Sequence, residues 1–181
     1  DLRKVSAEFL NEHPFFGHAV GGSLGANKHQ MYEVIALTMS YLSKDRPVHL
    51  LGIGGVEDIF QGVLQGIDTF DCVHPTRIAR HGGALVKPWN RQDDKKREHL
   101  NLRNSQYRSD LNPIEPDCAC NTCANYTRGY LHHLLKTEIF LAFTLIAQHN
   151  AFFMNHLMKE IRLALEQDKF LALFNHWGYK E

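Results

Sequence analysis

Short apolar segments alternate with amphipathic helical patterns over the first 73 residues, and this alternation constrains the fold most strongly. The apolar segments have strand length and lie at residues 15–20, 48–53 and 67–73. Apolar residues at helical spacing lie at residues 2–12, 31–42 and 59–64. Because parallel strands need a crossover connection, usually a helix, the alternation predicts a parallel sheet with helices packed on it.

Three strand and helix units are fewer than a closed parallel barrel contains. A (β/α)8 barrel takes about 250 residues, whereas this chain has 181. The first helical pattern also needs a preceding strand. We therefore predict an α/β fold that is the C-terminal part of a TIM-type (β/α)8 barrel; a small complete α/β domain is the alternative.

Charge and hydropathy exclude several function classes. The 20 basic residues balance the 20 acidic ones, so a generally basic nucleic-acid binder is not indicated, although a local basic patch is compatible with a neutral chain. No apolar run approaches the ~18 residues of a membrane span, and the first residues lack the apolar segment of a signal peptide. We expect a cytoplasmic protein that does not bind membranes.

Three of the four cysteines crowd into six residues, as Cys118, Cys120 and Cys123. Such spacing favours one tetrahedral zinc ion over a disulfide framework. A metal-free thiol cluster is the alternative. The fourth ligand is not local, and spacing alone does not choose among the downstream candidates, which are His132, His133, His149 and His156. Three thiolates and an imidazole leave no open position for water, so the site would be structural.

The chain divides into three parts on these patterns. Residues 88–117 are polar, include the charged run at 93–98 and show no sustained periodicity, which is typical of an exposed insertion or linker. Apolar stripes after Cys123 predict two or three helices. We therefore predict barrel units at 1–87, the linker at 88–117, and a zinc-binding subdomain with C-terminal helices at 118–181.

Two carboxylates accompany the third predicted strand. Asp68 and Asp71 are three positions apart and therefore face opposite sides of a strand. In parallel α/β folds the carboxyl ends of strands face the active site, so Asp71 is the candidate nucleophile or base. An aspartate that caps a turn is an equally weighted alternative.

A basic segment follows directly. Residues 74–81 contain His74, Arg77, Arg80 and His81, and guanidinium groups at this place would suit phosphate oxygens. A solvated basic loop is the common alternative.

Several motifs together resemble the tRNA-guanine transglycosylase family, also called queuine tRNA-ribosyltransferase, over nearly the whole chain. They are Ala19-Val20-Gly21-Gly22, Leu50-Leu51-Gly52-Ile53-Gly54, Phe70-Asp71-Cys72-Val73-His74-Pro75-Thr76-Arg77 with Ala79-Arg80, Asn101-Leu102-Arg103-Asn104, the cysteine cluster, and Tyr130-Leu131-His132-His133-Leu134.

The resemblance implies a modified eightfold barrel with an inserted zinc subdomain, of which this chain would be the C-terminal half. It also implies exchange of guanine at the wobble position of tRNA for a 7-deazaguanine, queuine or its precursor, by double displacement through a covalent intermediate. The partners implied are such a tRNA, the deazaguanine base and a second copy of the chain.

The resemblance also implies site residues. Asp71 matches the nucleophile, and the family interval of 25 residues after the third cysteine selects His149 as the fourth zinc ligand. The matched base-binding residues are Gly22, Ser23, His49 and Leu51. The matched RNA-binding residues are Gly52, Ile53, Gly54, Gly55, Val56, Glu57, Asp58, Thr76, Arg77, Ile78, Ala79 and Arg80.

The sequence departs from the family pattern at several places. His49 stands where a tyrosine is frequent, Gly55 stands where a lysine is frequent, and residues 88–99 resemble an insertion. The family's other base-gripping aspartates and a glutamine fall outside this sequence, so we expect the 181-residue chain alone to be inactive.

Two other functions are compatible with parts of this sequence. A non-catalytic, zinc-containing tRNA-binding partner subunit is the alternative within the family, and the presence of Asp71 favours the enzyme instead. An unrelated barrel glycosidase is disfavoured because no second carboxylate shares the face of Asp71.

Overall fold

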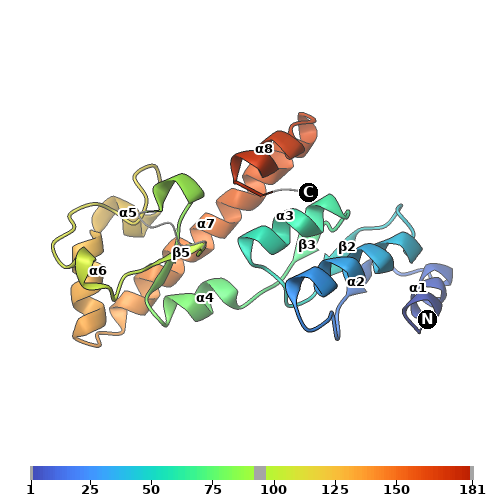
Figure 1. The fold of residues 1–181 in the computed structure, drawn as a ribbon, viewed down its shortest axis with the longest axis horizontal. Coiled ribbons are helices and arrows are strands. Elements are labelled where there is room, and N and C mark those ends of the chain that lie inside the picture. Colours follow the sequence, from blue (N-terminus) through green and yellow to red (C-terminus); the bar gives the residue numbers. More distant parts are fainter. Residues whose placement is uncertain (1, 92–96, 180–181) are drawn as a thin grey trace. The chain divides into compact units, whose positions relative to one another are not determined.

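The computed structural model describes residues 2–91 and 97–179 (Figure 1). It consists of two compact units, Asp1–Val73 and His74–Glu181. Residues 74–87, which the sequence pattern groups with the barrel units, pack with the second unit. The three-part division at 87/88 and 117/118 stays a prediction.

The first unit alternates helices and strands in the predicted order. Its elements are α1 (Leu2–Glu12), β1 (His18–Val20), α2 (Lys28–Tyr41), β2 (Val48–Leu50), α3 (Val56–Leu64) and β3 (Thr69–Phe70). The strands form one parallel sheet in the order β1-β2-β3. The predicted parallel sheet is thus confirmed, whereas its closure into a barrel stays a prediction. The strands are shorter than the apolar segments: residues 15–17 precede β1, residues 51–53 follow β2, and the segment 67–73 extends beyond β3 at both ends.

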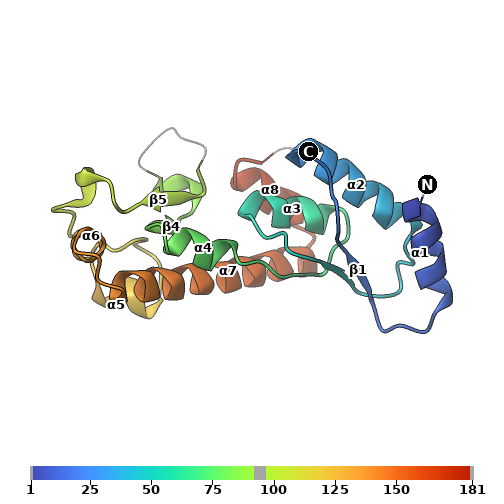
Figure 2. The same cartoon turned by 90° about the horizontal axis from the view of Figure 1, so that it is seen from below.

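Helices α2 and α3 lie on one face of this sheet (Figure 2). Val20 and Leu50 of the sheet are buried in one core with Ile35 of α2. The paired residues between these positions, Ala19 on β1, His49 on β2 and Thr69 on β3, are exposed or half-buried. The sheet therefore has a helix-covered face and an open face, as period-two alternation requires.

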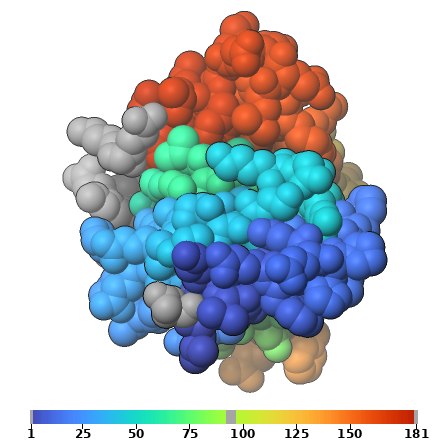
Figure 3. Space-filling view, turned by 90° about the vertical axis from the view of Figure 1, so that its right-hand side faces the viewer, coloured from blue at the N-terminus to red at the C-terminus, as the bar shows by residue number. Residues whose placement is uncertain are grey.

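Helix α1 adds Ala7 to the same core. Its other apolar side chains stay on the surface: Leu2 is 89% exposed and Phe9 is 56% exposed. The helix is seen in dark blue at the front of the space-filling view (Figure 3).

The second unit is mostly helical. Its elements are α4 (His74–Ala79), β4 (Gly83–Leu85), η1 (Pro88–Asn90), β5 (His99–Asn101), η2 (Ser105–Tyr107), α5 (Asn121–Asn125), α6 (Arg128–Lys136), α7 (Leu141–Glu166) and α8 (Phe170–His176). The strands β4 and β5 pair antiparallel. Helix α7 contacts α4, α5, α6, α8 and β4, and it therefore forms the axis on which this unit packs (Figures 1 and 2).

The expectation of an exposed linker at 88–117 is wrong for part of that segment. Leu100, Leu102, Tyr107 and Ile114 are buried in the core of the second unit, together with residues of α6 and α7. The described part of the segment lacks α-helical periodicity because it folds as the strand β5, the short 3-10 helices η1 and η2, and loops. Of the charged run, residues 93–96 lie outside the described part of the chain, as does much of the proposed insertion at 88–99.

Two further details differ from the sequence pattern. Of the helices predicted after Cys123, α7 runs without a break from Leu141 to Glu166, and the polar pair His149 and Asn150 in its middle is buried. Of the basic segment, residues 74–79 form the helix α4 rather than a loop. Within the described residues, no helix has both the length and the apolar character needed to cross a membrane.

Candidate active site and metal centre

Asp71 follows the last residue of β3 and lies at the carboxyl edge of the parallel sheet. Its Oδ1 accepts two hydrogen bonds, one from the backbone N–H of Gly52 at 3.0 Å and one from Nε2 of His49 at 3.1 Å. Its side chain is 61% exposed. The carboxylate is therefore accessible and has one oxygen held in place.

The hydrogen bonds also set the charge of this group. The Gly52 N–H and then the His49 side chain hold the pKa of the Asp71 carboxyl below its ordinary value of 3.8. Asp71 is therefore an anion at neutral pH, the form that a nucleophile or a general base requires.

Gly52 can offer its N–H because of its backbone conformation. Its φ is 73°, in the left-handed region that glycine adopts without a steric cost. Gly54, two residues on, packs against Cys72: a Cβ at Gly54 would lie 2.5 Å from the Cβ of Cys72. Glycines thus let the loop after β2 approach the chain on either side of Asp71.

Asp68 has a different environment. Its Oδ2 accepts a hydrogen bond from the N–H of Val48 at 2.8 Å, at the start of β2. The two aspartates thus lie at opposite ends of β3, Asp68 before its first residue and Asp71 after its last. Asp68 satisfies a backbone donor, whereas the exposed Asp71 carries the candidate chemistry.

Three predicted base-binding residues lie at the same sheet edge. The N–H of Leu51 donates to the carbonyl of Val20, which joins the ends of β1 and β2. Gly21 leaves room for Leu51, whose side chain is 48% exposed, and Gly22 turns the chain with a φ of 80°. Gly22, Ser23 and Leu51 therefore share the edge with Asp71, and their contact with a base stays a prediction.

The predicted RNA-binding residues fall into two groups. Residues 52–58 form the connection from β2 to α3 and the first turn of α3. The carboxylates of Glu57 and Asp58 both pair with Lys28, at 3.0 Å and 2.8 Å. The second group, residues 76–80, lies in the second unit, where Arg77 and Arg80 are exposed and Ala79 is buried.

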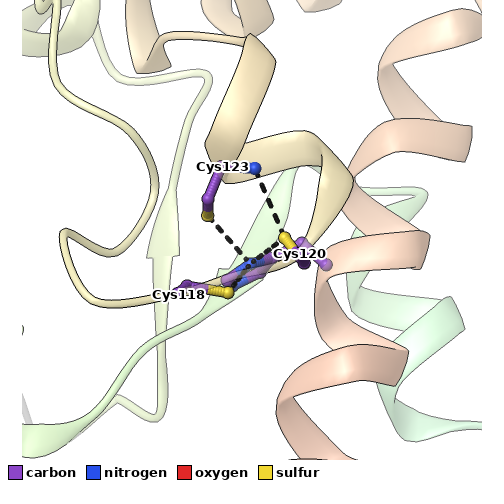
Figure 4. Close-up of side chains that lie close together, drawn as sticks. Cys118, Cys120 and Cys123 are labelled. Carbon is purple, nitrogen blue, oxygen red and sulfur yellow. Dashed lines mark hydrogen bonds between the residues drawn. The ribbon is translucent and has the colours of Figure 1, made fainter.

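The four predicted metal ligands come together inside the second unit. Figure 4 shows the three cysteine side chains turned toward one another, with Cys120 at the start of α5 and Cys123 within it. The Sγ atoms of Cys118, Cys120 and Cys123 lie 3.6 Å, 3.5 Å and 3.3 Å from Nδ1 of His149. All four ligand atoms lie within 4.8 Å of one another, so they can hold one metal ion.

The surroundings orient His149 for this task. Its Nε2 lies 2.8 Å from the carbonyl oxygen of Leu85, an acceptor, so Nε2 carries the proton and Nδ1 is left as a ligand. The neighbouring Asn150 holds both β4 and α4: its Oδ1 accepts from the N–H of Leu85, and its Nδ2 donates to the carbonyl oxygens of Gly83 and, in α4, Pro75. The sequence offers no signal for the role of Asn150.

The other histidine candidates are engaged elsewhere or face away. Nδ1 of His132 lies 2.8 Å from the carbonyl oxygen of Leu102, and His156 pairs with Glu160 at 3.2 Å. His133 is exposed on α6. Among these candidates only His149 reaches the thiols.

The charges in the cluster also suit a metal. A hydrogen bond with Cys123, followed by one with His149, lowers the pKa of the Cys118 thiol to about 3. The same bond with Cys118, followed by burial, raises the pKa of Cys123. The cluster therefore holds thiolate charge beside an imidazole, which is the donor set that zinc prefers.

Thr69 is a site residue that the sequence analysis missed. Its Oγ1 lies 2.8 Å from Nδ1 of His49. The signal was available in principle, because Thr69 is two residues before Asp71 and hence on the same face of β3.

Comparison with known proteins finds sequence similarity to one family over nearly the whole chain. A family model described as queuine tRNA-ribosyltransferase matches residues 1–180. The queuine tRNA-ribosyltransferase of Roseiflexus sp. (strain RS-1) is 45% identical over 177 residues, which are 98% of this chain and 43% of that protein. The protein of the same name from Thermoanaerobacter pseudethanolicus is 40% identical over 186 residues, 100% of this chain and 47% of that protein. The chain thus spans about half the length of the curated relatives it matches.

Proposed function

This chain belongs to the queuine tRNA-ribosyltransferase family, and from that premise we propose that it carries the nucleophile of an enzyme that exchanges guanine at the wobble position of tRNA for a 7-deazaguanine. The observation that carries the proposal is Asp71: an accessible carboxylate at the end of a parallel strand, with one oxygen held by Gly52 and His49.

The proposed exchange has two displacements at the anomeric carbon of the ribose. In the first, an oxygen of Asp71 forms a bond to C1′, the bond from C1′ to N9 of guanine breaks, and guanine leaves with its electron pair and takes up a proton. In the second, the corresponding nitrogen of the deazaguanine loses a proton and attacks C1′, and the carboxylate of Asp71 is released. A retained glycosyl ester of this kind is the chemistry by which retaining glycosidases use a carboxylate.

The loop residues beside Asp71 would receive the base. We propose that the backbone at Gly22 and Ser23 approaches the heterocycle, which the absent side chain of Gly22 permits. The exposed Leu51 would form an apolar wall against its flat face, and His49 is paired with Thr69 of the strand that precedes the nucleophile.

Two sets of residues would hold the RNA. Arg77 and Arg80 are exposed guanidinium groups that suit phosphate oxygens. Residues 52–58 would contact RNA mainly through backbone N–H groups, since Lys28 offsets only one of the two negative charges of Glu57 and Asp58. The ion pairs reduce the repulsion that two bare carboxylates would exert on a phosphate chain.

The metal that we propose for the second unit is zinc, held by Cys118, Cys120, Cys123 and His149. Four protein ligands close the coordination sphere, so the ion would stabilise structure and take no part in the exchange.

The test is guanine exchange by the protein as the cell makes it. Labelled guanine or deazaguanine is supplied with a tRNA that has a wobble guanine, and we expect label to enter that tRNA and not one with adenine at the position. Absence of exchange would contradict the proposal. Tight tRNA binding without exchange would instead support the non-catalytic partner subunit. Guanine exchange by the isolated 181 residues would contradict the expectation that they are inactive alone.

Cytoplasmic location and a homodimer are part of the same proposal. Sedimentation of the protein at micromolar concentration is expected to give twice the mass of one chain. A single-chain mass would contradict the dimer and leave the exchange chemistry unaffected.

A further inference from the structure

His49 has no assigned chemical role beyond its match to a base-binding position, yet it makes two side-chain contacts to the strand that carries the nucleophile. We propose that His49 is a positioning residue, which holds Oδ1 of Asp71 so that Oδ2 faces the anomeric carbon, and that Thr69 in turn fixes the His49 ring. The inference rests on the proposed function of Asp71 as the nucleophile.

Strand register makes both contacts possible. His49 pairs with Thr69 across the parallel strands β2 and β3. Asp71 is two residues after Thr69, so the two side chains project from the same face. The imidazole therefore spans both, with Nδ1 2.8 Å from Oγ1 of Thr69 and Nε2 3.1 Å from Oδ1 of Asp71.

The partners also define where the imidazole proton is. An ionised carboxylate only accepts hydrogen bonds, so Nε2 of His49 carries the proton that points at Asp71. In the neutral ring, Nδ1 is then an acceptor, and the hydroxyl of Thr69 is the donor that it faces. Thr69 is β-branched and has few rotamers, which makes it a firm anchor for the ring.

The consequence for Asp71 is an asymmetry between its two oxygens. Oδ1 receives both donors, His49 and the backbone N–H of Gly52. Among the described contacts of the first unit, Oδ2 receives no hydrogen bond. Oδ2 is therefore the oxygen free to attack, and the pair of bonds on Oδ1 stops the carboxylate from rotating away. Orientation of this kind is worth a large factor in rate, because an error of about 1 Å can cost about 100-fold.

The test uses the protein as the cell makes it, with three substitutions measured in single-turnover formation of the covalent RNA adduct. His49→Phe keeps a flat ring but removes both nitrogens, and we expect adduct formation to slow by about 100-fold with tRNA affinity changed less than twofold. His49→Gln restores an N–H donor and is expected to recover at least a tenth of the parent rate. Thr69→Val keeps the shape but removes the hydroxyl, and is expected to slow the step by about fivefold.

The control is His29→Phe, because His29 is an exposed histidine on α2 whose ion-pair partner is Glu33 on the same helix. We expect the parent rate for it. Circular dichroism and bound metal are measured for each variant, so that misfolding is recognised.

Several outcomes would overturn the positioning role. They are an unchanged adduct rate in His49→Phe, a loss of tRNA affinity that accounts for the whole rate loss, and a His49→Gln rate no better than that of His49→Phe. Failure of the parent protein itself to form an adduct would instead refute the proposed function. The two failures are therefore distinguishable.

Discussion

At Asp71, two hydrogen bonds to one oxygen decide both charge and orientation. The bonds from Gly52 and His49 favour the ionised carboxyl, so its pKa lies below 3.8. Since the pKa of the folded state is depressed, ionisation is complete above the ordinary value and is lost only as the pH falls through the lower, folded value. Asp71 therefore stays ionised in the mildly acidic range.

This account predicts the titration of the Asp71 side chain. Carbon NMR of the labelled carboxyl is expected to give a midpoint below 3.8 in the parent protein and a higher midpoint in His49→Phe, which lacks one donor. A parent midpoint above 3.8 would contradict the geometry, and an unshifted midpoint in the variant would show that the His49 bond is not formed in solution.

The buried Arg128 forms a second cluster of contacts that can be tested by substitution. Its guanidinium pairs with Asp110 at 3.2 Å and donates to the carbonyl of Ile114 at 2.8 Å. Burial raises the pKa of Asp110, but hydrogen bonds from Asn112 and Arg128 outweigh it and leave the pKa lowered. The pair thus ties the loop before the cysteines to α6, and the stability it contributes is present at neutral pH and lost in acid.

Removal of one partner would leave the buried Arg128 charge uncompensated. We expect Asp110→Ala to lower the free energy of unfolding of the second unit by about 3 kcal/mol, measured by denaturant unfolding with metal present. Glu166→Ala, at the exposed end of α7, is the control and is expected to change it by less than about 0.5 kcal/mol. Equal effects of the two substitutions would show that the ion pair contributes no more to the free energy of unfolding than an exposed carboxylate does.

On the scale of elements, the loop from β2 to α3 is shaped by close approach to Cys72. A methyl group at Gly54 would overlap the Cβ of Cys72, so Gly54→Ala is expected to displace the loop and the Gly52 N–H with it. We predict faster hydrogen exchange at Gly52 and slower adduct formation. The double variant Gly54→Ala/Cys72→Gly removes the overlap and is expected to recover most of the rate; no recovery would mean that the alanine acts in another way.

The helices and strands that could be predicted from sequence are those with one buried face. The helices α2 and α3 and the parallel sheet follow from apolar periodicity, because each has one buried face. The pairing of β4 with β5 could not be predicted, since the two strands have three residues each and β4 is held by the side chain of Asn150 on α7. The same is true of the unbroken α7, whose polar pair His149 and Asn150 is buried by contacts far away in sequence.

For the whole molecule, the cysteine motif predicted a metal site but did not identify the fourth ligand that completes it. Spacing placed three thiols together, and the family interval selected His149, which the structure brings to the thiols. The hydrogen bond from His149 to Leu85 depends on tertiary packing and has no local signal. The resemblance to the family is confirmed by the comparisons, whereas the roles of Asp71 and of the arginines stay predictions.

Metal removal is expected to affect the two units differently, because all four ligands lie in the second unit. We predict that elemental analysis of the purified protein finds one zinc ion per chain. A strong chelator or Cys120→Ser is expected to raise hydrogen exchange in α5 and the middle of α7, since metal binding is coupled to folding, and to leave β1, β2 and β3 unchanged. Cys72→Ser, at the cysteine outside the cluster, is the control and is expected to keep the zinc. Metal loss without any change in exchange would contradict a structural role.

We propose that Asp71 forms a covalent bond to the ribose, and trapping of that adduct is the decisive experiment. The protein as the cell makes it is incubated with a wobble-guanine tRNA, denatured, and digested for mass spectrometry. We predict a denaturant-resistant protein–RNA species whose modified peptide contains Asp71, and none from Asp71→Asn, which is expected to bind the tRNA with the parent affinity. An adduct that forms on another residue, or one that persists in Asp71→Asn, would contradict the account.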